Sequence, residues 1–223
     1  MARLKGPLPE PKLTRKTTAL LCVDLQYGDT HPDFGLSAKA KQLGMQAMME
    51  PFWERVRALV IPNIRRLQAT AREREVEVVH VRVASRTRDG RDGTPRYRQN
   101  AAKRKVAGLR DSKEAQILPE VGPVGDEIAI DKTTSGLFNS TTADMMLRNM
   151  GIRNLIIFGV STNGCVESTT RGAAELGYNN ILVEDACAAL LPELHENSVL
   201  SMSIHNDAFI RKTAEVIRLL KAL

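Results

Sequence analysis

The chain has 223 residues, of which 43% are hydrophobic; this is enough to bury the core of one large α/β domain and argues against disorder. No apolar run reaches the roughly 20 residues that span a bilayer, and the basic N-terminus carries prolines in place of the apolar core of a secretory signal. Because three cysteines without a CxxC spacing do not make a disulfide framework, we expect a reduced, soluble, cytoplasmic protein that has no membrane partner.

The formal net charge is +6, and the densest basic stretch runs from Arg82 to Lys105. Such a stretch is typical of nucleic-acid binding when aromatic residues are interleaved with the basic ones. Here Tyr97 is the only aromatic residue in the stretch. We therefore expect a solvated loop or a subunit contact, with an anion-attracting rim as the alternative, and no nucleic acid partner.

Strand-like and helix-like patterns alternate from Thr18 onward. Apolar runs predict strands at residues 18–25, 76–83, 127–132, 154–160 and 180–184. Helices are predicted at about 50–74 with a kink or restart at Pro62, from a cap at Asn139 or Ser140 to about 149, at 165–176, at about 193–206, and after Thr213 as an N-cap. Since there is no internal repeat or flexible linker, we expect residues 1–223 to form one domain with residues 1–17 as an extended arm.

Repeated βα units predict an α/β fold with three α-β-α layers and a mostly parallel central sheet. In such folds the carboxyl ends of the strands form the binding crevice. Asp24, Lys132 and the segment Ser161–Cys165 each stand at the end of a predicted strand. An acid, a base and a thiol therefore converge at one edge of the sheet.

These three groups suit nucleophilic catalysis by a thiolate. A helix N-terminus and a nearby ammonium group are expected to lower the thiol pKa of Cys165. Asp24 would take the thiol proton and return it to a leaving amine, while the turn at residues 161–164 would aim backbone N–H groups at the oxyanion. Alone, each residue has a structural alternative: a buried or redox cysteine, a turn-capping aspartate, a surface lysine. Cys22 and Cys187 are predicted to be buried hydrophobic residues.

Sequence blocks along nearly the whole chain carry a resemblance to a known family. The blocks are ALLCVDLQ, DKTTSGLFNST, GVSTNGCVESTTRGAAELGY, LVEDACAAL and ELHENSVL. Together they resemble the isochorismatase-like cysteine hydrolases, which include nicotinamidases, N-carbamoylsarcosine amidohydrolase, ureidoacrylate hydrolases and biuret hydrolases. The resemblance implies that Asp24, Lys132 and Cys165 are the catalytic triad. It also implies a cis peptide bond between Val160 and Ser161, which turns the backbone amide of Ser161, with that of Cys165, toward the oxyanion.

Departures from the family's patterns narrow the expected chemistry. Nicotinamidases hold a metal with an Asp-x-His motif after the second strand, where this chain reads HVRVASRTRDGRDG. We therefore expect no metal, no other cofactor and no nicotinamidase activity. We interpret His80 as a strand residue, and His195 and His205 as residues on the faces of a late helix. Because the isochorismate-cleaving members do not depend on a cysteine at the position of Cys165, the resemblance favours the amidohydrolase branch.

Some residues outside the triad are predicted to contact the substrate. Tyr27, His31 and Phe34 follow the first block in a segment that contributes to the pocket wall in the family, although an exposed loop of this kind equally suits a subunit contact. Arg82 and Arg86, at the end of the second strand and beyond it, would hold a substrate carboxylate or polarise a ureide oxygen. By resemblance alone we expect a homo-oligomer, either a dimer or a tetramer.

The resulting hypothesis is a cysteine amidohydrolase that cleaves a C–N bond of a small amide, carbamoyl or ureido compound through a thioester acyl-enzyme. One alternative is a ligand-binding or interaction protein that keeps the fold without turnover. Among enzymes, the alternatives are a nicotinamidase-type and an isochorismatase-type hydrolase.

Overall fold

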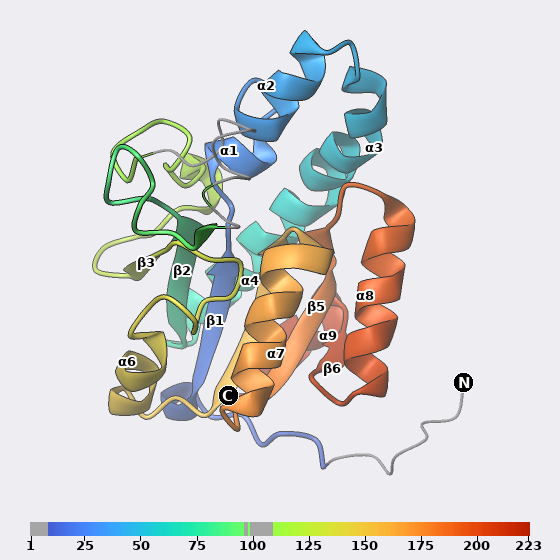
Figure 1. The fold of residues 1–223 in the computed structure, drawn as a ribbon. Helices are drawn as coiled ribbons and strands as arrows, with labels where there is room; N and C mark the ends of the chain where they lie inside the picture. Colours follow the sequence, from blue (N-terminus) through green and yellow to red (C-terminus); the bar gives the residue numbers. More distant parts are fainter. Residues whose placement is uncertain (1–8, 96–97, 99–108) are drawn as a thin grey trace.

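A parallel sheet forms the centre of the protein (Figure 1). The computed structural model describes residues 9–95, 98 and 109–223. Within these residues the strands are β1 (Thr18–Val23), β2 (Glu77–Val83), β3 (Ile128–Lys132), β4 (Asn154–Val160), β5 (Asn179–Ala188) and β6 (Phe209–Arg211). Their order across the sheet is β3-β2-β1-β4-β5-β6, and every neighbouring pair is parallel.

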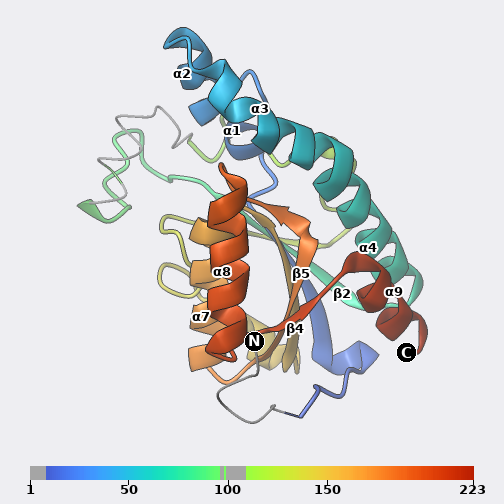
Figure 2. The ribbon, with the colours of Figure 1, turned by 90° about the vertical axis from the view of Figure 1, so that its right-hand side faces the viewer.

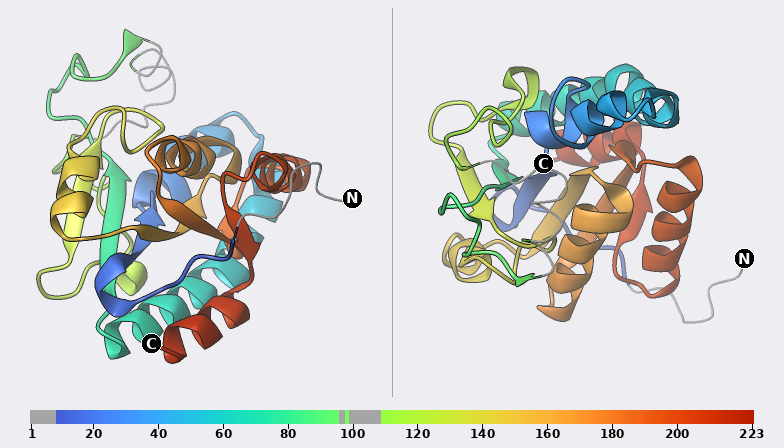
Figure 3. Two further views of the ribbon diagram at one scale, coloured as in Figure 1. Left: turned by 90° about the horizontal axis from the view of Figure 1, so that it is seen from below. Right: turned by 45° about the horizontal axis from the view of Figure 1, so that its top comes forward.

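Helices cover both faces of the sheet, which confirms the predicted three-layer α-β-α architecture. In the part of the chain that the structure describes, the labelled α-helices are α1 (Tyr27–Thr30), α2 (Gly35–Gln42), α3 (Gln46–Arg55), α4 (Ile61–Glu73), α6 (Ala143–Asn149), α7 (Glu167–Glu175), α8 (Pro192–Ile204) and α9 (Thr213–Lys221). The other turns are the 3₁₀ turns η1 (Arg15–Thr17) and η3 (Pro119–Val121) and the π-helical turns η2 (Val56–Val60) and η4 (Thr162–Val166). α4 and α9 lie on one face, and α7 and α8 lie on the other (Figures 1 and 3).

The two central strands are buried on both sides. Every residue of β1 and of β4 is buried, as expected for parallel strands that have helices on each face. Leu20 and Ile156 of these strands share one hydrophobic core with Ile64 of α4 and Val216 of α9. No helix in the described ranges has the length and apolar character needed to cross a membrane.

A long helical run leads from α3 to α4 and changes geometry in its middle. α3 begins at Gln46, ahead of the predicted start at Glu50. The π-helical turn η2 joins α3 to α4, and Pro62 lies in the first turn of α4. The predicted kink or restart at Pro62 is therefore confirmed, because the hydrogen-bond pattern changes just before the proline. α2 and α3 extend beyond the sheet (Figure 2).

Two predicted helix N-caps are wrong. The helix expected from near Ser140 begins at Ala143, as α6. The Ser140 hydroxyl instead accepts a hydrogen bond of 3.1 Å from the backbone N–H of Thr133, in the loop after β3. Thr213 is the first residue of α9 rather than its N-cap, and its N–H and hydroxyl both donate to Asp185 Oδ1 at 2.7 Å. At both places a tertiary contact uses the polar side chain that the sequence suggests as a cap.

The carboxyl-terminal part of the sheet is larger than predicted. β5 continues to Ala188, so Cys187 lies inside this strand rather than after it. The register between β4 and β5 shifts between Ile157 and Gly159. β6 was not predicted, because a strand of three residues is too short to show a periodic pattern.

Residues 9–17 are the described part of the predicted N-terminal arm. The Arg211 guanidinium of β6 pairs with the Glu10 carboxylate at 2.6 Å. The side-chain amide of Asn154, in β4, donates to the carbonyl oxygen of Lys12 at 3.3 Å. These contacts tie the arm to the sheet, and residues 1–8 of the predicted arm lie outside the described ranges.

Gly159 lets β1 and β4 approach closely at the carboxyl edge of the sheet. It pairs with Val23, the residue before Asp24. Its φ is +131°, and a Cβ atom at this position would lie 2.0 Å from the carbonyl oxygen of Val23. Only glycine fits here, because any side chain would overlap the neighbouring backbone.

Gly159→Ala should therefore lower the free energy of unfolding by more than about 3 kcal/mol, through backbone overlap and an unfavourable φ together. Gly177→Ala is the matched control, since its φ is also positive (+82°) but no atom lies within 4 Å of the added Cβ. The control should cost about 1 kcal/mol. Urea unfolding of both variants measures the difference, and equal losses would contradict the prediction.

Candidate active site

The three predicted catalytic residues come together at the carboxyl edge of the sheet. Asp24 directly follows β1, Lys132 is the last residue of β3, and Cys165 lies in the turn η4 between β4 and α7. The Lys132 ammonium donates a hydrogen bond of 2.9 Å to Asp24 Oδ2, and the Cys165 thiol interacts with both side chains. Strand topology thus places an acid, a base and a thiol in one cluster, as predicted from the order of the strands.

Burial differs sharply within the cluster. The side chains of Lys132 and Asp24 are 0% and 1% exposed, whereas Cys165 is partly exposed. The Lys132 ammonium has a further partner in the carbonyl oxygen of Thr134, at 3.1 Å. A charged pair without access to water persists only when it is well hydrogen-bonded, and such pairs are common at functional sites.

Asp24 leaves its strand through an unusual backbone conformation. Its φ is +52°, a region that aspartate tolerates better than most residues, and its N–H donates to the Val81 carbonyl of β2 at 2.9 Å. Oδ2 accepts the hydrogen bond from Lys132, whereas Oδ1 is buried and is not bonded to Lys132. Oδ1 therefore keeps its lone pairs for a donor other than Lys132.

The two charged groups shift each other's proton affinity. Burial raises the pKa of the Asp24 carboxyl, and the Lys132 charge and the hydrogen bonds from Cys165 and Lys132 only partly oppose this. Burial disfavours the Lys132 ammonium, but Asp24 and Cys165 outweigh it and raise the pKa of Lys132 above its ordinary value. Lys132 therefore stays charged, and Asp24 becomes a stronger base than an exposed carboxylate.

The thiol pKa of Cys165 moves in the direction opposite to the one predicted. Burial is the largest cause and raises the pKa; the negative charge of Asp24 raises it further, and Lys132 opposes both. The prediction that a helix N-terminus and a lysine lower this pKa was wrong, because it left out burial and the adjacent carboxylate. The resting group is a thiol, so a base must remove its proton during any reaction.

Gln26 fixes the segment that carries Asp24, and the sequence analysis missed this role. Its side chain is fully buried. The amide group donates to the carbonyl oxygens of Val83 (3.0 Å) and Glu114 (3.1 Å), and the amide oxygen accepts from the Val83 N–H at 2.6 Å. The segment after β1 is thus tied to the end of β2. The only signal in the sequence was a polar residue directly after an apolar strand.

The turn before Cys165 has two features in addition to its position. The peptide bond between Val160 and Ser161 is cis, as the family resemblance implied. The carbonyl oxygen of Ser161 accepts backbone hydrogen bonds from Gly164 (3.0 Å) and Val166 (3.3 Å). The turn is π-helical and runs directly into α7. The helix predicted to open at Cys165 therefore begins at Glu167, two residues later.

A buried histidine contacts this turn from α8. His195 Nδ1 lies 2.9 Å from the Thr162 hydroxyl, and its Nε2 lies 3.0 Å from the Arg55 guanidinium. Burial and the Arg55 charge lower the pKa of His195 from 6.5 to about 4, so the imidazole is neutral at pH 7. The sequence analysis placed His195 on a helix face, which is confirmed, but assigned it no partner. His205, the other histidine of that interpretation, is the C-cap of α8.

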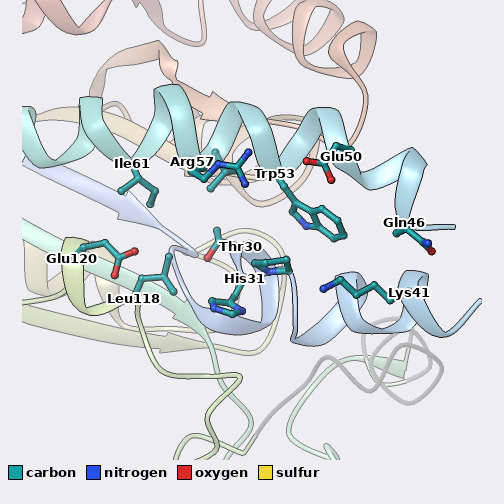
Figure 4. A pocket seen from close by; sticks show the side chains of 12 residues that line it. Thr30, His31, Lys41, Gln46, Glu50, Trp53, Arg57, Ile61, Leu118 and Glu120 are labelled. Carbon is teal, nitrogen blue, oxygen red and sulfur yellow. The ribbon is translucent and has the colours of Figure 1, made fainter. Parts of the chain in front are cut away.

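Three of the predicted substrate contacts pack against one another. The rings of Tyr27, His31 and Phe34 form a cluster with centroid distances of 5.2 Å for each pair. His31 also lines a cavity of about 500 Å³ between α1 and the α3–α4 run, opposite Trp53 (Figure 4). Asp24, Lys132 and Cys165 do not line this cavity. A substrate contact by the three rings stays a prediction.

The two predicted arginine contacts have different surroundings. Arg82 pairs with Asp131 at 2.6 Å and donates to the Ala115 carbonyl oxygen at 3.1 Å, so its guanidinium already has protein partners. Arg86 is exposed, and its backbone N–H donates to Asp92 at 2.7 Å. Of the basic stretch from Arg82 to Lys105, residues 96–97 and 99–105, with Tyr97 among them, lie outside the described ranges.

The remaining cysteines and histidines have structural surroundings. Cys22 and Cys187 are 1% and 0% exposed, and burial raises the pKa of each thiol to about 12, which confirms them as buried hydrophobic residues. His80 is buried in β2, as predicted, and contacts Glu127 at 3.0 Å. Within the described ranges, no three His, Cys, Asp or Glu side chains gather closely enough to hold a metal ion.

The family model of the isochorismatase domain matches residues 18–217. The chain belongs to the isochorismatase family. Among its relatives, the ureidoacrylate amidohydrolase RutB of Acinetobacter baylyi is 30% identical over 213 residues, which cover 89% of this chain and 82% of that protein. The uncharacterized isochorismatase family protein YecD of Escherichia coli O157:H7 is 41% identical over 93 residues, which cover 38% of this chain and 50% of YecD.

Solved structures of the isochorismatase type share the fold along most of the chain. A cysteine hydrolase from Pseudomonas syringae pv. phaseolicola 1448A superposes with a TM-score of 0.80 and 24% identity, covering 98% of this chain and 99% of that one. N-carbamoylsarcosine amidase from Thermoplasma acidophilum superposes with a TM-score of 0.66 and 22% identity, covering 88% and 96%. At these identities the likeness concerns the fold, and it confirms the predicted isochorismatase-like architecture.

The buried His195 of this isochorismatase-family hydrolase should make folding stability depend on pH. Its pKa is about 4 in the folded protein and near 6.5 when unfolded, so the unfolded chain binds the proton more readily and stability falls as pH drops through this window. Between pH 7 and pH 5 this group should cost about 2 kcal/mol of unfolding free energy. Urea unfolding at both pH values should therefore show a smaller loss for His195→Asn than for the wild type. His205→Asn, at an exposed histidine, should lose as much as the wild type, and equal losses in all three proteins would contradict the prediction.

The carboxylate of Asp24 should keep the Cys165 thiol protonated. In Asp24→Asn the negative charge is gone while Lys132 remains, so the thiol pKa should fall below that of the wild type. The pH dependence of Cys165 alkylation by iodoacetamide, followed by mass spectrometry, measures this pKa. Asp126→Asn, at an exposed carboxylate, should leave it unchanged, and an equal or higher thiol pKa in Asp24→Asn would refute the assignment.

Proposed function

We propose that this isochorismatase-family hydrolase is a cysteine amidohydrolase that cleaves a C–N bond of a small amide, carbamoyl or ureido compound. The observation that carries the proposal is the buried ion pair of Lys132 and Asp24 beside Cys165, a residue that is partly exposed. A nucleophile needs access to substrate, whereas its base and its counter-charge work best away from water. Burial in this cluster follows that division.

The proposed reaction begins with proton transfer from Cys165 to Asp24 Oδ1, the oxygen not bonded to Lys132. The sulfur then attacks the carbonyl carbon of the substrate, and the carbonyl oxygen becomes an oxyanion. Lys132 stays charged and stabilises the negative charge that develops on the sulfur. In this proposal the backbone amides of Ser161 and Cys165 bind the oxyanion.

Collapse of the tetrahedral intermediate breaks the C–N bond. The proton held by Asp24 moves to the leaving nitrogen, which departs as ammonia or an amine, and a thioester on Cys165 remains. Asp24 then takes a proton from water, and the water oxygen attacks the thioester carbon. The C–S bond breaks, the sulfur recovers its proton from Asp24, and the acid product leaves. One water molecule is consumed in each cycle.

Two observations support the amide or ureide class of substrate. A relative that aligns with 89% of this chain is named a ureidoacrylate amidohydrolase. The segment after β2 lacks the Asp-x-His motif that the metal-holding nicotinamidases carry. We propose Tyr27, His31, Phe34 and Arg86 as substrate contacts. Arg82 is a weaker candidate for a substrate contact, because its guanidinium is already bound to Asp131.

Replacement of the nucleophile tests the proposal. Wild-type protein should release ammonia from at least one member of a panel of carboxamides, carbamoyl amino acids, biuret-like ureides and nicotinamide. Cys165→Ala should lower kcat by at least about 1,000-fold, since covalent catalysis is lost. Cys187→Ala removes a buried thiol outside the cluster and should keep kcat within about threefold of wild type when assayed below its unfolding temperature.

Intact-mass spectrometry of rapidly quenched reactions should show an acyl adduct on Cys165 of the wild type. Retention of activity in Cys165→Ala would refute the mechanism. No turnover of any panel member, together with binding of one of them, would favour the alternative of a ligand-binding protein on the same fold.

A further inference from the structure

A chain of buried hydrogen bonds reaches the proposed oxyanion turn from a direction that the reaction scheme does not use. Thr162 follows Ser161 in the turn before Cys165, and its side chain is fully buried. The Thr162 hydroxyl lies 2.9 Å from His195 Nδ1, on α8. His195 is 7% exposed, so the contact is almost free of competing water.

The partners of His195 determine which ring nitrogen carries the proton. A guanidinium has only donors, so Arg55, 3.0 Å from Nε2, makes that nitrogen the acceptor. In a neutral imidazole the proton then lies on Nδ1, which donates to the Thr162 hydroxyl oxygen. The low pKa of His195 agrees with a neutral ring.

Arg55 is itself fixed from two sides. Its Nε donates to the carbonyl oxygen of Cys187 at 2.8 Å, and Nη2 donates to that of Glu184 at 3.2 Å. Both acceptors lie in β5, where the register with β4 shifts just before the turn. This series of hydrogen bonds therefore links the end of α3, strand β5 and helix α8 to the Thr162 hydroxyl of the turn.

We propose that His195 is a positioning residue that holds the Thr162 hydroxyl, and thereby sets the backbone of the turn Ser161–Cys165. The inference rests on the proposed function, because that turn is where the oxyanion is proposed to bind. His195 acts through Thr162 and touches no substrate. Arg55 selects the His195 tautomer with the proton on Nδ1, and this nitrogen then donates a hydrogen bond to the Thr162 hydroxyl.

Two amide variants separate the two hydrogen bonds of His195. His195→Asn places an amide donor near the position of Nδ1 and keeps the bond to Thr162, but it loses the contact with Arg55. His195→Gln places its amide near Nε2, keeps the contact with Arg55 and loses the donor to Thr162. Thr162→Val removes the hydroxyl at nearly constant shape, and Thr162→Ser retains it.

In steady-state hydrolysis of a panel substrate, His195→Gln and Thr162→Val should each lower kcat by about 10- to 100-fold with KM within about threefold, because a misplaced oxyanion site affects mainly the transition state. The double variant should lose no more than either single variant, since both remove the same bond. His195→Asn and Thr162→Ser should stay within about threefold of wild type. Urea unfolding checks that each variant is folded at the assay temperature.

A second readout does not depend on amide hydrolysis. The Cys165 thiol adds to [1-¹³C]acetaldehyde: the S–C bond forms, the carbonyl becomes a hydroxyl group, and the thiol proton ends on that oxygen. This oxygen occupies the oxyanion position, so the NMR-measured Kd of the adduct should rise at least about tenfold in Thr162→Val and His195→Gln. Alkylation of Cys165 by iodoacetamide forms no oxyanion, and its rate should stay within about twofold.

The proposal is overturned if His195→Gln and His195→Asn behave alike, if Thr162→Val keeps the wild-type aldehyde Kd, or if the wild type forms no aldehyde adduct. Equal loss of aldehyde binding and alkylation would mean a general disturbance of the site, and this also overturns it. If the wild type hydrolyses no panel substrate but the aldehyde series follows the expected order, the proposed function fails and the role of His195 stands.

Discussion

The buried contact between Lys132 and Asp24 is the constraint around which the catalytic edge is arranged. Both charges have left water almost completely, and removing ions of this size from water costs several kcal/mol each unless partners replace the solvent. The partners come from different places: β1 supplies the carboxylate, β3 supplies the ammonium, and the Thr134 carbonyl completes the lysine's shell. Because β2 lies between β1 and β3, the pair forms only when the three strands are in register.

The same pair explains why the thiol is protonated at rest. A lysine alone beside Cys165 would favour a thiolate, but here the lysine's charge is already balanced by Asp24, and burial then penalises a further negative charge. In the proposed reaction the carboxylate becomes neutral as the sulfur becomes negative. The total charge of the cluster stays constant during that step, so little reorganisation of the buried surroundings is needed.

Two hydrogen-bond networks support the cluster, one toward β2 and one toward β5. On the β2 side, Gln26 joins the segment after β1 to Val83. On the β5 side, His195 links Arg55 to Thr162 in the turn before Cys165. The bonds of Gln26 to Val83 and of His195 to Thr162 join neutral groups, so they add no charge next to the buried pair, and because they are buried they have few competing partners. Gly159 adds a steric requirement, since only its lack of a Cβ lets β1 and β4 bring Asp24 and Cys165 to one edge.

The sequence by itself determined the parallel strands and the residues at their ends, because buried strands leave long apolar runs and each run stops at a polar residue. That was enough to predict that Asp24, Lys132 and Cys165 meet. Only the tertiary structure decided the protonation of the thiol, the partners of His195 and Gln26, and the short strand β6. Each of these depends on burial and on groups brought together from distant parts of the chain. A local sequence pattern shows neither the burial of a group nor its distant neighbours. The caps wrongly predicted at Ser140 and Thr213 have the same cause, because a tertiary partner took the hydrogen bond that local spacing suggested.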